Sequence, residues 1–338
     1  MRIFTLLLGL SALMACTDAA FDEARARQEI LELEKEQRRV HFEADAASFA
    51  DMLAEPHLSV NRGVVGFSER SENYERFSAY FNSVDFVEWD DLAEPIIRFS
   101  ADGSLAYCVV QRRVSVRYPS DEGLYFGTTD FAWTAIYRHG TNGWEIESVS
   151  STNAEPSTAY LLNIEARADC ISPEGPYQTY LLADHQGGLE FRQSYSYREG
   201  AFAARLNGYD EGYLLNGDEQ SGEALEPSVI NMLQGHNFFW MYLQPQLFFD
   251  LSIQDPQQAT GTDALGYSVT VKRDEEHYQI QEILLRNPMD TTELIEIHYE
   301  EFDSTAFGPM PLALSIVQAQ KDTFHFRFTS VNFNVEQQ

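Results

Sequence analysis

Lysine is scarce in this 338-residue chain, which has only Lys35, Lys272 and Lys321 among its 23 basic residues. Aspartate and glutamate number 53, so the formal net charge is −30 at pH 7. A chain with this charge repels phosphate backbones and anionic headgroups, and no basic stripe offsets the repulsion. We therefore expect no nucleic-acid partner. We interpret the acidity as a source of solubility, with an acidic partner-binding face as the alternative.

Cysteine is also rare, with three residues in the chain. Cys108 and Cys170 lie too far apart in the sequence for the ligand spacing of a zinc site. We favour two separately buried thiols, and a disulfide that ties two domains together is the alternative. Nucleophile elbows, His-Glu-x-x-His, Cys-x-x-Cys, phosphate loops and dinucleotide-binding glycine patterns are all missing. The sequence thus predicts no metal and no cofactor, and we interpret Asp90–Asp91 as solvated charge in a turn.

Long hydrophobic runs are missing after residue 16, so no later segment has the ~18 apolar residues of a membrane-spanning helix. The run at residues 3–15 follows Arg2 and is too short to span a bilayer, as in an export signal. It ends in Leu-Met-Ala-Cys, which resembles the bacterial lipobox. The resemblance implies cleavage before Cys16, acylation of Cys16 and anchoring to a membrane of the cell envelope. Thr17 favours the periplasmic face of the outer membrane, and an ordinary secretory signal is the alternative.

Secondary-structure patterns divide the remaining chain into two parts. Residues 24–43 and 68–84 carry apolar side chains at helical spacing, and a short helix and a strand lie between them. From residue 95 to 151 the pattern alternates with period two, and turn signals separate the strands. This order predicts an α+β domain over residues 27–155, in which helices pack on one face of a curved antiparallel sheet.

Two stretches of this part, DAASFADMLAEPHLSVNRG and YRHGTNGWEIESVSST, resemble the NTF2-like superfamily and most closely its SnoaL-like branch. The resemblance implies a cone-shaped cavity, which in that superfamily serves isomerases, cyclases, dehydratases and non-enzymatic ligand binders. In ketosteroid-isomerase-like members an aspartate base follows the first strand, and that position falls on Asn61. An amide cannot take a proton from carbon at neutral pH. Arg38 falls near the family's tyrosine position, and both departures argue against proton abstraction.

Strand alternation predicts which side chains would line such a cavity. Arg113 lies on one face of the strand at residues 105–117, and Trp133 lies on one face of the strand at residues 131–137. We expect Asn61, Arg113 and Trp133 to form a small-ligand site with an aromatic wall and one anion-holding arginine. The alternative is that Arg113 faces solvent and the aromatic residues are core.

The second part, residues 169–338, alternates strand after strand and follows a weakly helical connector at residues 156–168. An irregular aromatic segment interrupts the strands. The strand order and turns resemble LolA/LolB-like envelope proteins. The resemblance implies a β-rich, half-open barrel whose concave side holds a lipid or another hydrophobic ligand. The side chains expected to line it are Phe238, Trp240, Tyr242 and Phe248, and their alternative role is to fill the barrel as core.

These expectations combine into an exported, lipid-anchored envelope protein that binds a small hydrophobic ligand or another envelope component without turnover. Residues 1–15 would be removed as a signal peptide, and residues 16–26 would form a tether. The alternative function is a SnoaL-like enzyme in the first domain, acting as an isomerase, a cyclase or a hydrolase.

Overall fold

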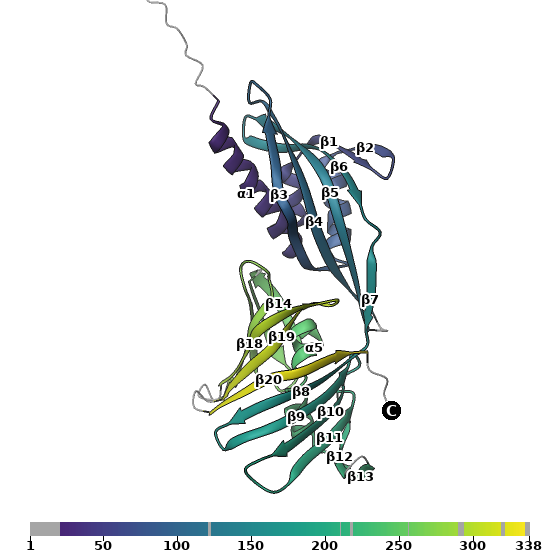
Figure 1. The fold of residues 1–338 in the computed structure, drawn as a ribbon, viewed down its shortest axis with the longest axis vertical. Helices are drawn as coiled ribbons and strands as arrows, with labels where there is room; N and C mark the ends of the chain where they lie inside the picture. Colours follow the sequence, from purple (N-terminus) through teal and green to yellow (C-terminus); the bar gives the residue numbers. More distant parts are fainter. Residues whose placement is uncertain are drawn as a thin grey trace, which may run out of the picture.

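Two bodies lie end to end in the computed structural model, with the first at the top of Figure 1 and the second below it. The structure describes residues 21–120, 123–209, 211–216, 219–255, 257–289, 294–318 and 322–334. The expected signal peptide and Cys16 lie outside these residues. No helix in the described part of the chain has both the length and the apolar character needed to cross a bilayer.

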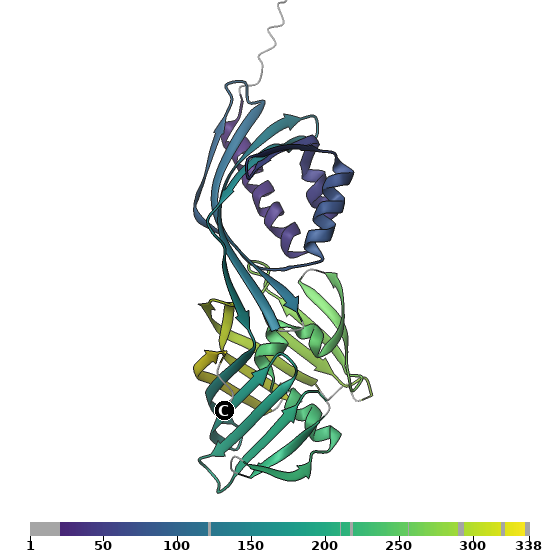
Figure 2. The same ribbon diagram turned by 90° about the vertical axis from the view of Figure 1, so that its right-hand side faces the viewer.

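The first body is a curved sheet with three helices on its concave side, as Figure 2 shows. The helices are α1 (Glu23–Phe42), α2 (Ala46–Met52) and α3 (Arg70–Phe81). The strands are β1 (Leu53–Asn61), β2 (Val64–Ser68), β3 (Asp85–Phe99), β4 (Leu105–Ser120), β5 (Gly123–Gly140), β6 (Gly143–Asn153) and β7 (Ser157–Leu161). They pair in the order β2-β1-β6-β5-β4-β3, with β7 beside β5, and β1 runs parallel to β6. The predicted helix-on-sheet α+β arrangement is confirmed.

The helices of this body begin at residues that can bond their free backbone N–H groups. Asp22 accepts from the backbone N–H of Arg25 at 3.1 Å, and Asp45 accepts from that of Ser48 at 3.0 Å. Helix α1 then buries Ala26, Ile30, Glu34, Gln37, Val40 and His41. This spacing is the apolar stripe of an amphipathic helix, except that it includes three polar side chains.

The second body is a 13-stranded antiparallel sheet in the order β13-β12-β11-β10-β9-β8-β20-β19-β18-β17-β16-β15-β14. The strands before its helices are β8 (Asn163–Ser172), β9 (Gly175–Asp184), β10 (Gly188–Tyr195), β11 (Ala201–Asn207), β12 (Gly212–Asn216) and β13 (Glu219–Ala224). The helices are α4 (Pro227–Gln234), α5 (Phe238–Leu243) and the 3-10 helix η1 (Pro245–Leu247). The later strands are β14 (Phe249–Asp255), β15 (Gln258–Asp263), β16 (Ser268–Arg273), β17 (Ile280–Arg286), β18 (Leu294–Thr305), β19 (Gly308–Gln318) and β20 (Asp322–Phe333). Among the described residues β13 and β14 are the two edges, so this sheet is open, and the LolA-like half-barrel stays a prediction.

The connector between the bodies differs from the expectation. Residues 157–161 form β7 and residues 163–172 form β8, so only Leu162 lies between the two sheets. The local helical preference of this segment is weak, and strand pairing with a distant part of the chain overrides it. Ser157–Leu161 pairs with Leu124–Thr128 of β5. The expected helical connector at residues 156–168 is therefore wrong.

The two bodies share part of one core. Leu124, Phe126 and Leu161 belong to the first sheet, yet they are buried in the same cluster as the interior of the second sheet. The rings of Phe126 and Phe307 lie 5.3 Å apart between centroids. This packing joins the bodies through apolar contacts as well as through the chain.

Both described cysteines are free and buried, as the favoured interpretation held. Cys108 lies in the core of the first body, and Cys170 lies in the core of the second. Burial raises the pKa of each thiol to about 12, so both are protonated at neutral pH.

Candidate functional site

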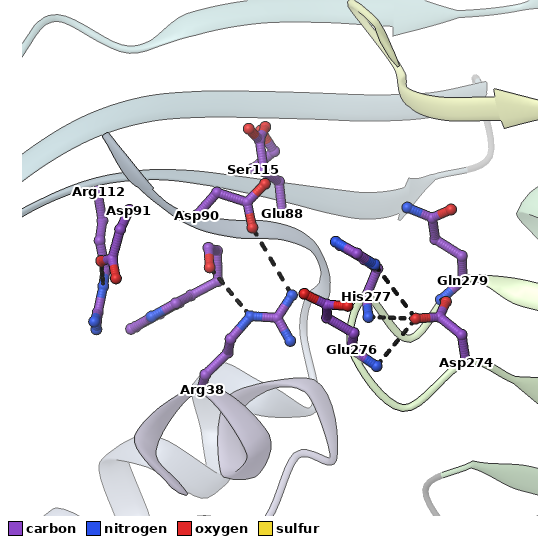
Figure 3. Close-up of polar contacts among 11 residues, drawn as sticks. Arg38, Glu88, Asp90, Asp91, Arg112, Ser115, Asp274, Glu276, His277 and Gln279 are labelled. Atoms are coloured by element: carbon purple, nitrogen blue, oxygen red, sulfur yellow. Dashed lines mark hydrogen bonds and ion pairs between the residues drawn. The ribbon is translucent and has the colours of Figure 1, made fainter. Parts of the chain in front are cut away.

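We call the first body the first domain and the second body the second domain. A four-residue strip of β3, residues 88–91, separates two hollows at the surface of the first domain. One hollow lies between α1 and β3, and the other lies between the two domains (Figure 3). The β3–β4 register shifts on either side of the strip, between Phe86 and Glu88 and between Asp91 and Ala93. The expectation that Asp90–Asp91 lie in a turn is wrong, since both lie within the strand and form ion pairs with arginines.

The first hollow, which we call the helix pocket, has a volume of about 230 Å³. Its lining residues come from α1, β3 and β4: Gln28, Leu31, Glu34, Lys35, Arg38, Trp89, Asp91, Pro95 and Arg112. Most ligand pockets for drug-sized molecules exceed about 300 Å³, so the helix pocket suits a smaller molecule.

Arg112 lies at the wall of the helix pocket and is only 4 % exposed. Its Nη1 donates to Glu34 Oε2 at 2.8 Å, and its Nε donates to Asp91. The guanidinium carbon lies 5.3 Å from the ring centroid of Trp133 and 5.9 Å from that of Trp89. Burial opposes the charge, but the bonds to Asp91 and Glu34 outweigh it and raise the pKa of Arg112, which stays charged.

A buried polar network extends from Arg112 into the domain. Tyr137 donates its hydroxyl to Glu34 Oε1, and Gln37 Nε2 donates to the Tyr137 oxygen at 3.1 Å. Burial and the neighbouring Glu34 raise the pKa of Tyr137 well above its ordinary value. Both oxygens of Glu34 accept hydrogen bonds, one from Arg112 and one from Tyr137. The Tyr137 phenol and the Cys108 thiol are both protonated at neutral pH, because the pKa of each is raised.

His41 is surrounded by aromatic rings instead of facing a cavity. Its ring centroid lies 4.7 Å from that of Phe49, 5.0 Å from that of Phe81, 5.1 Å from that of Phe86 and 4.2 Å from that of Trp89. Its Nδ1 donates to the carbonyl of Gln37 at 2.6 Å, so the neutral ring carries its proton there. Burial lowers the pKa of His41 to about 4. These rings fill much of the space on the concave side of the sheet.

The helix pocket has more positive than negative side chains, although the chain as a whole is strongly acidic. Lys35, Arg38 and Arg112 line it together with Glu34 and Asp91. Lys35 forms no ion pair with any residue that the structure describes. The buried Nε1 of Trp89 also has no hydrogen-bond partner within the described chain. The pocket thus has one cation, Lys35, without an acidic partner among the described residues, whereas Arg38 and Arg112 have such partners.

The predicted site residues of the first domain do not form one cavity. Asn61 is exposed at the end of β1, in register with Ser151, which in turn pairs with Trp133. Trp133 does lie beside a buried arginine, but that arginine is Arg112. The predicted Arg113 has a 43 % exposed side chain on the other face of β4 and binds Asp130 with two hydrogen bonds of 2.8 and 3.1 Å. The expectation that Arg113 faces this cavity is wrong, and the structure agrees with the alternative that places Arg113 on the solvent-exposed face of its strand.

The correct arginine could have been identified from strand parity. Arg112 shares its face of β4 with the buried residues Ala106, Cys108, Val110 and Val114. This alternation marks the even-numbered positions as the inner face, and an arginine among them needs buried acidic partners, which Glu34 and Asp91 supply.

The aromatic residues predicted for the second domain are mainly core residues. Phe238 is 0 % exposed and packs on Phe326 with centroids 5.2 Å apart, and Trp240 is 1 % exposed. Tyr242 is buried against Tyr299 at 5.3 Å, while Phe248 is partly buried at the edge of the cluster. Phe238 and Trp240 belong to α5 and are buried in the core of the second domain. The packing therefore agrees with the alternative that these residues fill the barrel as core.

The second hollow, which we call the interdomain cleft, has a volume of about 630 Å³. Its first wall comes from β3, β4 and β5 and from residues 154–159, and its second wall comes from residues 277–279 and 304–309. Arg38 lines both this cleft and the helix pocket, and Arg113 lines the cleft. The two hollows therefore share a wall at α1 and β3.

A third cluster lies on neighbouring strands of the second sheet. The side-chain ligand atoms of Glu282, Glu296 and His298 approach within 4.8 Å of one another. Lys272 forms an ion pair with Glu282, so a positive charge is already present. We assign no metal to this cluster.

Comparisons with known proteins match part of the chain. No protein-family model matches the sequence, and no curated protein sequence matches it. An NTF2-like protein of unknown function in nutrient uptake from Rhodospirillum rubrum covers 40 % of this chain and 100 % of its own, with 17 % identity and a TM-score of 0.30. A protein named as a candidate scytalone dehydratase from Novosphingobium aromaticivorans covers 40 % and 87 %, with 8 % identity and a TM-score of 0.34. A candidate NTF2-like dehydratase from Streptomyces avermitilis covers 39 % and 99 %, with 11 % identity and a TM-score of 0.34.

Each of these matches covers 39–40 % of this chain. We base its function on the geometry of its own residues.

Proposed function

We propose that this protein binds a small organic anion in the helix pocket and does not chemically change it. The observation that carries the proposal is Lys35, a lysine at the pocket wall that forms no ion pair with any residue that the structure describes. Arg38 and Arg112 add two further cations to the wall, but each already lies beside acidic side chains of the protein. A carboxylate is the natural partner of such a set, because guanidinium and ammonium groups donate strong charge-assisted hydrogen bonds to it.

The remaining walls indicate what the anion carries. Leu31, Pro95 and Trp89 supply apolar surface beside the cations. The volume of about 230 Å³ limits the ligand to a small molecule. A carboxylic acid with a compact aromatic or branched apolar body meets both conditions. The sequence predicted a small hydrophobic ligand. The ligand proposed here has a hydrophobic body and, in addition, a charged carboxylate.

The state of the titratable groups supports binding without turnover. A general base needs a free lone pair and a pKa near the working pH. The pKa of His41 is lowered to about 4 and its ring is enclosed by aromatic side chains, and the pKa of Cys108 is raised to about 12. Glu34 is bonded through both oxygens. One observation favours the enzyme alternative, since Glu34 and Tyr137 form a buried, hydrogen-bonded titratable pair.

Calorimetry with benzoate tests the proposal. Benzoate carries a carboxylate on a compact ring, and benzamide is a neutral control of nearly the same shape. We expect benzoate to bind, benzamide to bind at least tenfold more weakly, and Lys35→Gln to weaken benzoate binding. Lys272→Gln is the matched control, because it makes the same charge change on the second domain. Equal binding of benzoate and benzamide would contradict the proposal, and consumption of benzoate-like acids during the titration would support the enzyme alternative.

We further propose, from residues 1–16 alone, that the protein is exported and anchored by lipid at Cys16 on the periplasmic face of the outer membrane. Acyl chains would supply nearly all of the attachment, at about 0.8 kcal/mol for each buried CH₂. Cys16→Ala should therefore move the protein from the membrane fraction to the soluble fraction. A variant that still sediments with membranes in high salt would contradict this anchor.

A further inference from the structure

The interdomain cleft is a second hollow with the opposite charge character. It is lined by the acidic residues Glu88, Asp90, Asp130 and Glu155 and by the basic residues Arg38 and Arg113. Its volume of about 630 Å³ falls within the range of ligand sites, which often lie between domains. What it can bind depends on which of these charges are already paired.

Both arginines of the cleft are held by the protein itself. Arg113 binds Asp130 through Nε and Nη2 at 2.8 and 3.1 Å. Arg38 donates its Nε to the carbonyl oxygen of Trp89 at 3.2 Å, and its guanidinium carbon lies 4.6 Å from the ring centroid of Phe42. Its Nη2 lies 3.9 Å from Asp90, at the limit of an ion pair. Neither arginine is therefore placed to hold an anion in the centre of the cleft.

Glu88 differs from Asp90 and Asp130 of the same cleft, because each of those two pairs with an arginine. It is partly buried and accepts one hydrogen bond, from the Ser115 hydroxyl at 2.7 Å. Within the described ranges no basic side chain lies at ion-pair distance from it. Burial, and then the neighbouring Asp90 and Asp130, raise the pKa of Glu88, although the hydrogen bond from Ser115 and the charge of Arg113 oppose this rise. A cation placed between Glu88 and Asp90 would relieve both the burial cost and the repulsion.

The second domain faces these carboxylates with the hydrogen-bonding side chains of His277 and Gln279. His277 and Gln279 come from the turn before β17, on the other side of the cleft in Figure 3. The turn is held in shape because Asp274 accepts hydrogen bonds from the backbone N–H groups of His277 and Gln279. Phe126 adds an apolar surface to the lining.

We infer that the interdomain cleft binds an organic cation that carries N–H groups, such as a primary amine. Its charged head lies between Glu88 and Asp90, and its body reaches Gln279 and Phe126. A bare divalent ion fits less well, because Ca²⁺ needs about six to eight oxygen ligands at close range. Of the carboxylates that line this wide cleft, Asp90 and Asp130 already have arginine partners. A ligand that contacts both walls holds the two domains together, so its binding stabilises the docked arrangement.

Calorimetry of the full chain with putrescine, at low ionic strength, tests the inference. We expect saturable binding, a loss of at least tenfold in Glu88→Gln and in Asp90→Asn, and no change in Glu94→Gln. Glu94 lies on the same strand, is exposed and makes the same charge change outside the cleft. Tetramethylammonium, which has no N–H group, should bind at least tenfold more weakly than putrescine.

Three results would overturn the inference. Equal losses in all three variants would mean that putrescine responds only to the net charge of the chain. Binding of Ca²⁺ with the same dependence on Glu88 and Asp90, without binding of putrescine, would assign the cleft to a metal ion. Absence of putrescine binding to the folded wild-type protein would also overturn the inference. If Glu88→Gln does not fold, Asp90→Asn still tests whether the cleft carboxylates bind putrescine.

Discussion

The ring of Tyr278 lies almost parallel to the ring of Phe42, with centroids 4.8 Å apart and planes at 13°. Tyr278 belongs to the second domain and Phe42 to the end of α1 in the first, so this stack joins the two. The Tyr278 hydroxyl donates to Glu43 at 3.3 Å. Tyr278 has a φ of 56°, which a bulky side chain rarely adopts. Because His277 and Gln279 flank it and line the interdomain cleft, this contact helps to set the distance between the cleft walls.

Replacing Tyr278 with Ala should loosen the docking of the two domains. The variant loses the stack on Phe42, the contact with Arg38 and the hydrogen bond to Glu43 together. We expect a larger radius of gyration by small-angle X-ray scattering, with the melting of each domain preserved. Tyr74→Ala, at an exposed tyrosine on α3, is the control. An unchanged scattering curve for Tyr278→Ala would mean that the shared core alone holds the docking.

The position of truncation should decide whether the first domain folds alone. Both fragments lose the second domain that covers Leu124 and Phe126. A chain that ends after Asn153 also lacks β7, whereas a chain that ends after Leu162 keeps that strand paired with β5. We expect the shorter fragment to bind a hydrophobic dye more strongly and to melt at a lower temperature than the longer one. Equal melting temperatures would show that β7 does not support the first sheet.

Adjacent arginines on β4 should differ sharply in their effect on stability. Arg112→Ala leaves Glu34 buried without its cation, and such losses typically cost about 3–5 kcal/mol. Arg113→Ala breaks an ion pair that is well exposed to solvent, where contributions are about 0–1 kcal/mol. Urea denaturation of both variants measures the two differences in the free energy of unfolding. Similar costs for the two would contradict the assignment of Arg112 to the inner face.

The pH dependence of stability should report on His41. Its pKa is about 4 in the folded chain, below the ordinary value of 6.5, so the unfolded chain binds more protons between these values. This histidine therefore contributes stability that is present above pH 6.5 and is lost as the pH falls toward 4, up to about 3 kcal/mol. We expect His41→Phe to lose less stability than the wild type between pH 7 and 4.

The control for that comparison is His325→Phe, at an exposed histidine on β20. It should follow the wild-type profile. If His41→Phe also follows the wild-type profile, His41 is protonated in the folded chain and the aromatic enclosure does not exclude its charge.

Local patterns predicted much of the first domain. The spacing of Tyr74, Phe77 and Phe81 marked α3, and period-two alternation marked the end of β3 and the strands β4 to β6. The first part of β3 was missed, since Asp90–Asp91 were expected in a turn. These patterns depend only on residues that are close in the sequence, so they can be recognised without knowledge of the fold. Strand β7 could not be found in this way, because it exists through pairing with residues 124–128 of β5.

The candidate site was only partly predictable for the same reason. An aromatic wall with an anion-holding arginine was expected, and Trp133 was placed beside it, but the arginine was assigned to Arg113 in place of Arg112. The roles of Arg38 and Lys35 depend on the approach of α1 to β3, which brings together residues more than 50 positions apart. The interdomain cleft depends on the docking of Tyr278 and Phe307, for which the sequence carries no local signal.

The most direct test of anion binding in the helix pocket is the NMR signal of the Trp89 indole N–H. Trp89 lines the pocket and its buried Nε1 has no acceptor among the described residues, whereas Nε1 of Trp144 donates to Glu29 at 3.2 Å. With the signal assigned by Trp89→Phe, we predict that benzoate shifts the Trp89 resonance in a saturable way and leaves that of Trp144 in place, while benzamide shifts neither. A Trp89 resonance that stays fixed while benzoate saturates the protein would place the anion elsewhere and contradict the proposed function.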